Sequence, residues 1–388
     1  PKTFGNTAAL MYGINTLGAA IGAALAGFYL PLWLGFNGTC ALAIIVSGGV
    51  AVVAFRLSRG TAPATIQATE TEDAPDEVAN PTGPRLTRQQ RRELARQQRK
   101  GSPPPPASPP PRTPPPGSRT TITLLSFLSG FGVLALEVLW TRLFSLVLEN
   151  SGYTFAAILV VVLVCLALGA LLSAGLARLS APPYFILALL ALAGAGAITA
   201  TPAIFMKVTD GMQLISSPGS WSSQMFLIFK AATLTIGPAA VLLGTIFPYL
   251  MKIEERHVVA PGLSLGRLAT VNTIGAILGA LLCGFLLLDW LGMWRSIQVI
   301  ALVYLASVLI MPLGWNARGI MTRTAGAGLL LLTAFVLDPR SLPVMSTDPT
   351  LPPETLVESW EGSDCTVTVT DSRFGRAIRI NSHYSLGS

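Results

Sequence analysis

Charge is scarce in this chain of 388 residues, because only 12% of them are Asp, Glu, Lys or Arg, against roughly 25% in soluble domains. The mean hydropathy is correspondingly high, at +0.59. Cysteine is scarce too, and Cys40, Cys165, Cys283 and Cys365 are too far apart for a zinc site or a disulfide framework. The composition excludes an ordinary water-soluble protein and predicts neither a metal site nor a nucleic-acid partner.

Long uncharged runs predict a membrane protein, because a transmembrane helix needs about 20 mostly apolar residues. We expect eight spans and a weaker ninth segment, Met321–Leu337, which Arg323 interrupts and which could be a short span or an interfacial helix. The eight spans are expected near Ala9–Leu30, Thr39–Phe55, Thr121–Leu148, Tyr153–Ala177, Tyr184–Met206, Gln224–Leu250, Leu268–Leu288 and Ser296–Leu313.

Proline and arginine gather in residues 58–120, between the second and third spans. This composition cannot bury a core, so we expect a disordered spacer. Lys and Arg also gather in the later loops on the same side, which places the spacer in the cytoplasm. Within it, Arg85–Lys100 could bind anionic lipid headgroups, or it could be a solvated stretch that fixes the topology.

An internal repeat relates two of the expected spans. Asn15–Phe36 and Asn272–Met293 align without a gap, with 13 of 22 residues identical. Four spans precede the second copy and one follows it, which predicts parallel six-helix halves of a major-facilitator-like bundle. Residues 1–57 would be the last two helices of a truncated first half, in agreement with a chain that starts at Pro1, and residues 121–337 would form the second half with the ninth segment.

Small residues recur every four positions in both copies, which predicts close helix packing. Asn15 and Asn272 open the two copies. They could cap these helices, bridge to neighbours or line a polar pathway.

Three charged residues lie well inside the expected spans: Glu137, Arg142 and Lys230. Such charges are rarely kept in a membrane without a partner or a wet cavity. Glu137 and Arg142 point about 140° apart around their helix and should not pair, and Arg142 is near enough to the end to snorkel. Lys230 is the natural partner for Glu137, either in a structural ion pair or in a proton or cation relay.

The composition becomes that of a soluble domain in residues 338–388. Polar and apolar residues alternate in Thr366–Thr370 and again in Arg376–Ile380, with turn residues between the two segments. This pattern predicts a short β-hairpin. No phosphate or cofactor loop, nucleophile elbow or metal cluster occurs in the chain, so we assign no catalytic residue.

Several segments resemble the bacterial membrane-fused spermidine synthase family, in which a major-facilitator-like helical region precedes a polyamine aminopropyltransferase domain. The most specific are EVLWTR (residues 137–142) and INSHYSLGS (residues 380–388); GTIFPYLMK and SWEGSDCTVTVTD add to the resemblance. Residues 121–388 carry most of it.

The resemblance implies a multi-pass protein of the bacterial inner membrane whose full-length form transfers an aminopropyl group from decarboxylated S-adenosylmethionine to putrescine. The chain contains only the start of that domain and lacks its cofactor and catalytic residues. His383 and Tyr384 could border the amine pocket, although a packed strand is the simpler interpretation. A polyamine or small-solute transporter and a purely structural anchor remain alternatives. The donor is made in the cytoplasm, so we expect that the ninth segment does not cross the membrane.

Overall fold

The computed structural model describes residues 4–60, 118–148, 152–213, 215, 219–255, 261–314, 316–335, 342–345, 354–362, 365–373, 375–381 and 384–387. The chain divides into two compact units: residues 1–39 with 114–388, and residues 40–113. Most of the predicted spacer, including Arg85–Lys100, lies outside the described residues. The described part of the second unit continues helix α2, and the first unit contains all the other elements.

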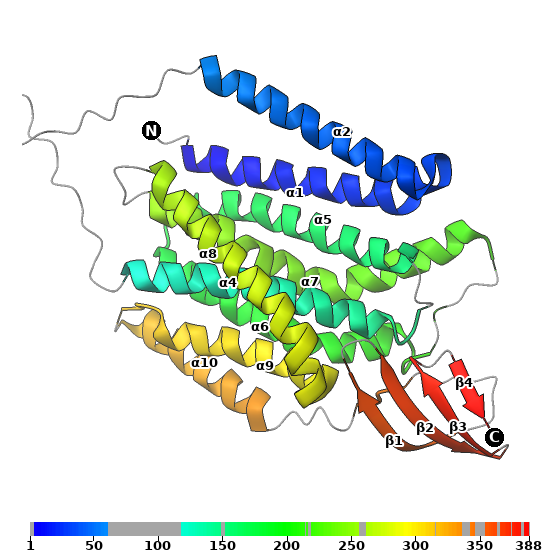
Figure 1. Cartoon of the computed structure of the whole chain (residues 1–388). Helices are drawn as coiled ribbons and strands as arrows, with labels where there is room; N and C mark the ends of the chain where they lie inside the picture. Colours follow the sequence, from blue (N-terminus) through cyan, green and yellow to red (C-terminus); the bar gives the residue numbers. More distant parts are fainter. Residues whose placement is uncertain are drawn as a thin grey trace, which may run out of the picture. The chain divides into compact units, whose positions relative to one another are not determined.

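Helices dominate the described chain (Figure 1). Each of the eight expected spans is confirmed as helical. The helices are α1 (Phe4–Phe28), α2 (Leu30–Gly60), α4 (Ser118–Phe144), α5 (Gly152–Leu176), α6 (Pro183–Val208), α7 (Trp221–Glu255), α8 (Pro261–Leu282) with the π-helical turn η1 (Cys283–Leu287), α9 (Leu288–Ile310) and α10 (Ala317–Phe335).

Seven of the helical runs are long and apolar enough to cross a membrane, so the chain is a multi-pass membrane protein. The longest run, Gly262–Ile310, has 49 residues. It is broken inside α9 at Gly292, whose φ of 73° and ψ of 176° are not helical, and the helix is kinked there. The same break occurs in α2 at Gly35, with φ 66° and ψ 175°. These two glycines are aligned in the sequence repeat, so both copies form a helix, a break and a second helix.

Helix α4 packs against α7, α8 and α9. Leu136, Leu139, Trp140 and Leu143 of α4 are almost completely buried. A Cβ atom at Gly275 or Gly279 of α8 would lie 2.2 Å from the carbonyl oxygen of Phe127 or Phe131 of α4, respectively. Only glycine permits this approach, and the predicted close packing through small residues is therefore confirmed for the second copy.

Helix α10, the ninth segment, runs antiparallel to α9. Gly326 lies beside Val308, and the Gln298 amide donates to the carbonyl oxygen of Thr333. Arg323 donates to the carbonyl oxygens of Met311 and Leu313 just beyond the end of α9, where cations are favourable. Helix α10 follows most of α9, but it is not among the seven runs that are long and apolar enough to cross a membrane. The expectation that this segment stays on one side therefore remains a prediction.

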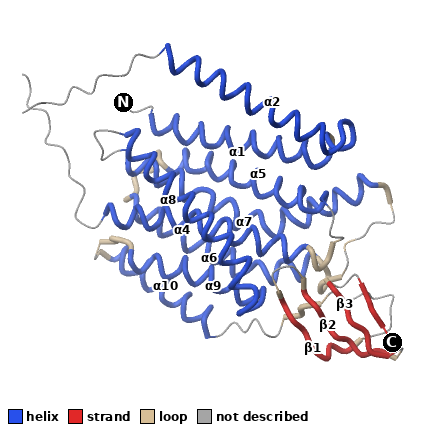
Figure 2. The backbone as a smooth tube through the Cα atoms, in the orientation of Figure 1, coloured by secondary structure: helices blue, strands red, loops and turns tan. Residues whose placement is uncertain are grey.

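The tail forms an antiparallel four-stranded sheet in the order β1-β2-β3-β4. The strands are β1 (Thr355–Glu361), β2 (Thr366–Ser372), β3 (Gly375–Ile380) and β4 (Tyr384–Gly387). The predicted hairpin is confirmed as β2 and β3, which pair with Val367 opposite Ile380 and Val369 opposite Ile378. Figure 2 shows the strands together at one end of the helical bundle.

Candidate functional site

The junction between the sheet and the helices is the most elaborate polar site in the described chain, and Arg142 is at its centre. Arg142 is at the end of α4 and is 8% exposed. Its Nη1 donates to Oδ1 of Asn381 and its Nη2 donates to Oγ1 of Thr366, both at 2.9 Å. We call these three residues the Arg142 clamp.

The two sheet residues of the clamp are also locked to each other. The backbone amide of Thr366 donates to Oδ1 of Asn381, and the backbone amide of Asn381 donates to the carbonyl oxygen of Thr366, each at 2.9 Å. Asn381 has a positive φ of 48°, which asparagine tolerates better than most residues. The acceptor atoms are therefore held in place for the guanidinium group, whose planar fork suits two fixed acceptors.

A carboxylate makes a second connection between the sheet and the helices. Oε2 of Glu361, at the end of β1, accepts a 2.7 Å hydrogen bond from the backbone amide of Met293. A Cβ atom on the preceding residue, Gly292, would lie 2.7 Å from Oε1 of Glu361. Because Met293 begins the helical part of α9 after the break, the carboxylate caps a helix N-terminus, where a negative charge is favourable.

The segment between α10 and the sheet is tied to the same end of the bundle. Nε1 of Trp294 donates to the carbonyl oxygen of Pro343 at 3.0 Å. The Trp294 ring also belongs to a packed aromatic group, because Phe205 lies 6.4 Å from it and 5.3 Å from Phe144, measured between ring centroids. The segment before the sheet is therefore attached to a well-packed part of the bundle.

The sheet turns polar side chains towards its buried side. Thr366, Thr368 and Thr370 of β2 are all buried, whereas Val367 and Val369 between them are only partly so. On neighbouring β3, Arg379 pairs with Glu354. Hydroxyl and charged groups therefore gather on the buried face of the sheet, where the Thr368 and Thr370 hydroxyls have no hydrogen-bond partner among the described residues. Among the described residues, no group of three or more His, Cys, Asp or Glu side chains could hold a metal ion.

The structure also fixes the two ends of α4 relative to the junction. Ser118, the first residue of α4, follows directly on residues 61–117, and Arg142, near its last residue, contacts the sheet. Helix α4 is one of the seven runs able to cross a membrane. The sheet and the attachment point of the spacer therefore lie at opposite ends of a membrane-spanning helix.

The prediction that Glu137 pairs with Lys230 is wrong. Glu137 is half-buried on α4 and Lys230 is exposed on α7. No ion pair joins them, and Glu137 has no hydrogen-bond or ion-pair partner among the residues that the structure describes. The predicted separation of Glu137 from Arg142 is confirmed, since Arg142 binds the sheet.

The two asparagines of the repeat have different surroundings. Asn272 is packed against α4, where a Cβ atom at Gly130 would meet its carbonyl oxygen at 2.0 Å, and its side-chain Oδ1 is buried without a hydrogen bond in the described chain. Asn15 is exposed on α1. The structure does not bring the two together at one site.

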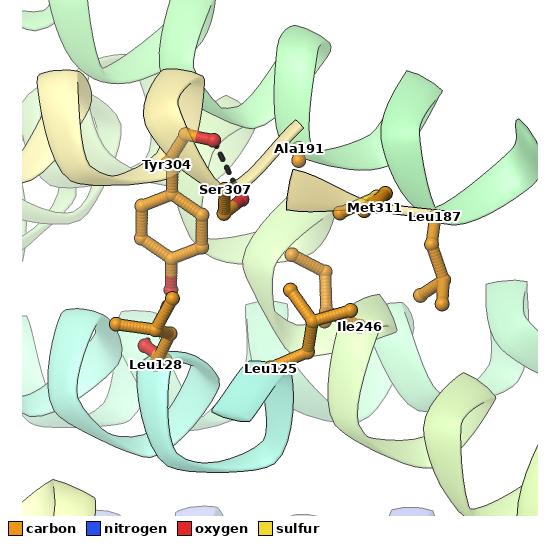
Figure 3. Close-up of a pocket in the computed structure, with 8 residues that line it drawn as sticks. All are labelled: Leu125, Leu128, Leu187, Ala191, Ile246, Tyr304, Ser307 and Met311. Carbon is orange, nitrogen blue, oxygen red and sulfur yellow. Dashed lines mark hydrogen bonds between the residues drawn. The ribbon is translucent and has the colours of Figure 1, made fainter. Parts of the chain in front are cut away.

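A cavity between α4, α6, α7 and α9 is small and apolar. Its lining is mainly leucine, isoleucine and alanine, with the Ser307 hydroxyl hydrogen-bonded to the Tyr304 carbonyl oxygen at 2.7 Å (Figure 3). Its volume of about 10 Å³ is close to the minimum for one water molecule. This cavity is too small for a polyamine or another organic solute.

The amine-pocket prediction lies outside what the structure describes. His383 is not among the described residues, and β4 is described at Tyr384 only as a backbone strand whose partner is Ile380.

Sequence reasoning missed the Arg142 clamp, because 239 positions separate Arg142 from Asn381. A signal was nevertheless present. Arg142 belongs to EVLWTR and Asn381 to INSHYSLGS, the two segments that carry the family resemblance most specifically. Read together, they would have predicted a contact.

Comparisons with known proteins give no assignment. No family model, no curated protein and no solved structure matches this chain.

Proposed function

We propose that this chain is a membrane scaffold that holds the first β-sheet of a C-terminal domain against one end of its helical bundle. The observation that carries the proposal is the Arg142 clamp. Burying a guanidinium group costs several kcal/mol unless its hydrogen bonds are made, and here they are made by residues of the sheet. A tail that merely followed the last helix would not need them.

The remaining contacts support a fixed sheet. Glu361 caps α9, Trp294 holds the segment before the sheet, and the cavity between α4, α6, α7 and α9 is too small for a substrate. By resemblance, the complete protein would be a spermidine synthase-like aminopropyltransferase of the bacterial inner membrane, with decarboxylated S-adenosylmethionine as its donor. The role of this part would be attachment and positioning.

The scaffold has two chemically different ends. Arg119, Arg178 and Arg267 lie at the end where the spacer joins, so the positive-inside rule favours a cytoplasmic spacer. The sheet is then on the outer side, where the aminopropyl donor is not made. For this reason the scaffold role is the core of our proposal, and the polyamine chemistry rests on the resemblance.

The test uses Cys365, a half-buried thiol that precedes Thr366. In a variant whose other three cysteines are replaced, Arg142→Ala removes two charge-assisted hydrogen bonds, each contributing about 1.5–3 kcal/mol. We expect the rate of maleimide labelling at Cys365 to rise at least tenfold. Arg178→Ala, at the exposed far end of α5, is the matched control. An unchanged labelling rate in the properly folded Arg142→Ala protein would refute the scaffold role.

Transport is a second candidate, and one observation favours it: Glu137 lies inside a membrane helix without a partner in the described chain. Unpaired intramembrane carboxylates commonly mark proton or cation pathways. Glu137→Gln in proteoliposomes should then abolish spermidine or proton flux, whereas Glu358→Gln, on the exposed sheet, should not. Absence of flux in the unsubstituted protein would remove this candidate.

A further inference from the structure

The two copies of the repeat bury opposite faces. In the first copy, α1 packs on α5 and α7, and Thr16, Ala20 and Phe28 are buried. A Cβ atom at Gly27 of α1 would lie 2.3 Å from Cβ of Ala156. In the second copy, α8 packs on α4 through the face that contains Gly275 and Gly279.

The face that one copy buries is exposed on the other. Ala20 is 2% exposed, but its counterpart Ile277 is 55% exposed; Phe28 is 6% exposed, but its counterpart Phe285 is 65% exposed. The converse holds for the glycines. Gly18 and Gly22 are the counterparts of Gly275 and Gly279, and a Cβ atom at either would have no neighbour within 4 Å.

Each copy therefore shows what the exposed face of the other copy is built to contact. We propose that the exposed faces of α1 and α8 form a docking surface for a second helical membrane unit that resembles α4–α7. Its first helix packs parallel to α1 on Gly18 and Gly22, as α4 packs on α8. Its second helix packs antiparallel to α8 on Ile277 and Phe285, as α5 packs on α1.

The second copy also specifies the chemistry of the occupant. In the α4–α8 contact, carbonyl oxygens of α4 lie close to Gly275 and Gly279 of α8. The backbone of Asn272 lies equally close to Gly130 of α4. The helix on α1 therefore needs a small residue opposite Asn15, the exposed counterpart of Asn272, and a backbone close enough to fill the space above Gly18 and Gly22. Interfaces of this kind rely on van der Waals packing and small residues.

Two other occupants fit less well. A second copy of this chain already has its α4 covered by α8 and its α5 covered by α1, so the helices with the required faces are in use. The helix that follows α1 is the counterpart of α9, and α9 packs on α4, α6 and α10 rather than along α8. In the second copy, the helix that covers the glycine face is therefore α4 and not the helix that follows α8.

Peptide cross-linking to the full chain in lipid nanodiscs tests the proposal. The probe is a synthetic peptide of residues 118–144, the α4 sequence, with a photoreactive benzoylphenylalanine in place of Phe131. We expect it to cross-link to α1 between residues 15 and 26. Gly22→Leu should lower the yield at least fivefold, whereas Leu17→Trp, which adds bulk to a neighbouring exposed face of α1, should leave it within twofold.

A second peptide, residues 152–176 with the same photoreactive group in place of Phe155, should cross-link to α8 and not to α1. The proposal is overturned if the α4 peptide does not label α1, if Gly22→Leu has no effect, or if the peptide labels only α8 by displacing the native α4. Photo-cross-linking through benzoylphenylalanine in place of Leu17, Gly18 or Gly22 that yields a homodimer joined at α1 would also overturn it, in favour of a second copy.

Discussion

The two copies of the repeat share their backbone and differ in their neighbours. Gly35 and Gly292 have nearly the same unusual torsion angles, with φ of 66° and 73°. At Gly292 the Glu361 carboxylate lies against the break, whereas a Cβ atom at Gly35 would have no neighbour within 4 Å. The local sequence thus determines where the helix breaks, and the rest of the chain determines which face and which end of each copy are occupied.

The largest expected difference between the copies concerns the glycines on their faces. Gly279→Leu should destabilise the protein by about 3 kcal/mol or more, because its side chain would clash with the carbonyl oxygen of Phe131, 2.2 Å from Cβ. Gly22→Leu at the aligned position should have little effect on the same protein, because nothing lies nearby. Thermal unfolding followed by size-exclusion chromatography in detergent measures both.

Equal losses in the two variants would contradict the idea that only the second copy is packed on this face. Gly175→Leu, in α5 with no neighbour within 4 Å, controls for the general effect of a larger side chain.

A smaller difference is expected at the helix breaks. Gly35→Ala and Gly292→Ala should each cost about 1–3 kcal/mol, because these torsion angles are essentially restricted to glycine. Gly292→Ala should cost more, since its Cβ would lie 2.7 Å from Oε1 of Glu361. Only Gly292→Ala should also accelerate the labelling of Cys365. If both variants accelerate it, the helix break itself, and not the contact with Glu361, determines how firmly the sheet is held.

The smallest expected effect sharpens the role of Glu361. Glu361→Ala removes the cap on Met293 and should destabilise the contact between the sheet and the helices by about 1 kcal/mol. Cys365 labelling should then be about fivefold faster. Glu358→Ala on the same strand is exposed and serves as the control; if the two variants behave alike, the cap does not hold the sheet.

Much of the fold could be predicted from sequence, because the evidence for a membrane helix is local. Uncharged runs located the eight helices, and alternation located the β2–β3 hairpin. The alternation of polar and apolar residues could not show which face of β2 is buried. In the structure, the buried face is the one that contains Thr366 and the other threonines.

The site was less predictable, because its contacts are long-range. A helical wheel separated Glu137 from Arg142 correctly, but it could not show that Lys230 is exposed or that Arg142 reaches Asn381. The surroundings of Arg323 in α10 were also not predicted. In the sequence, Arg323 interrupts an apolar run. In the structure, its guanidinium group donates hydrogen bonds to carbonyl oxygens just beyond the end of α9.

Helix α4 separates the attachment point of the spacer, Ser118, from the sheet, which the Arg142 clamp holds at the other end. We propose to label single cysteines from each side of sealed vesicles, using Arg88→Cys in the spacer and Arg376→Cys on the sheet, where the native side chain is 66% exposed. We expect a membrane-impermeant maleimide to reach the two cysteines from opposite sides. If both are labelled from the same side, α4 does not separate them.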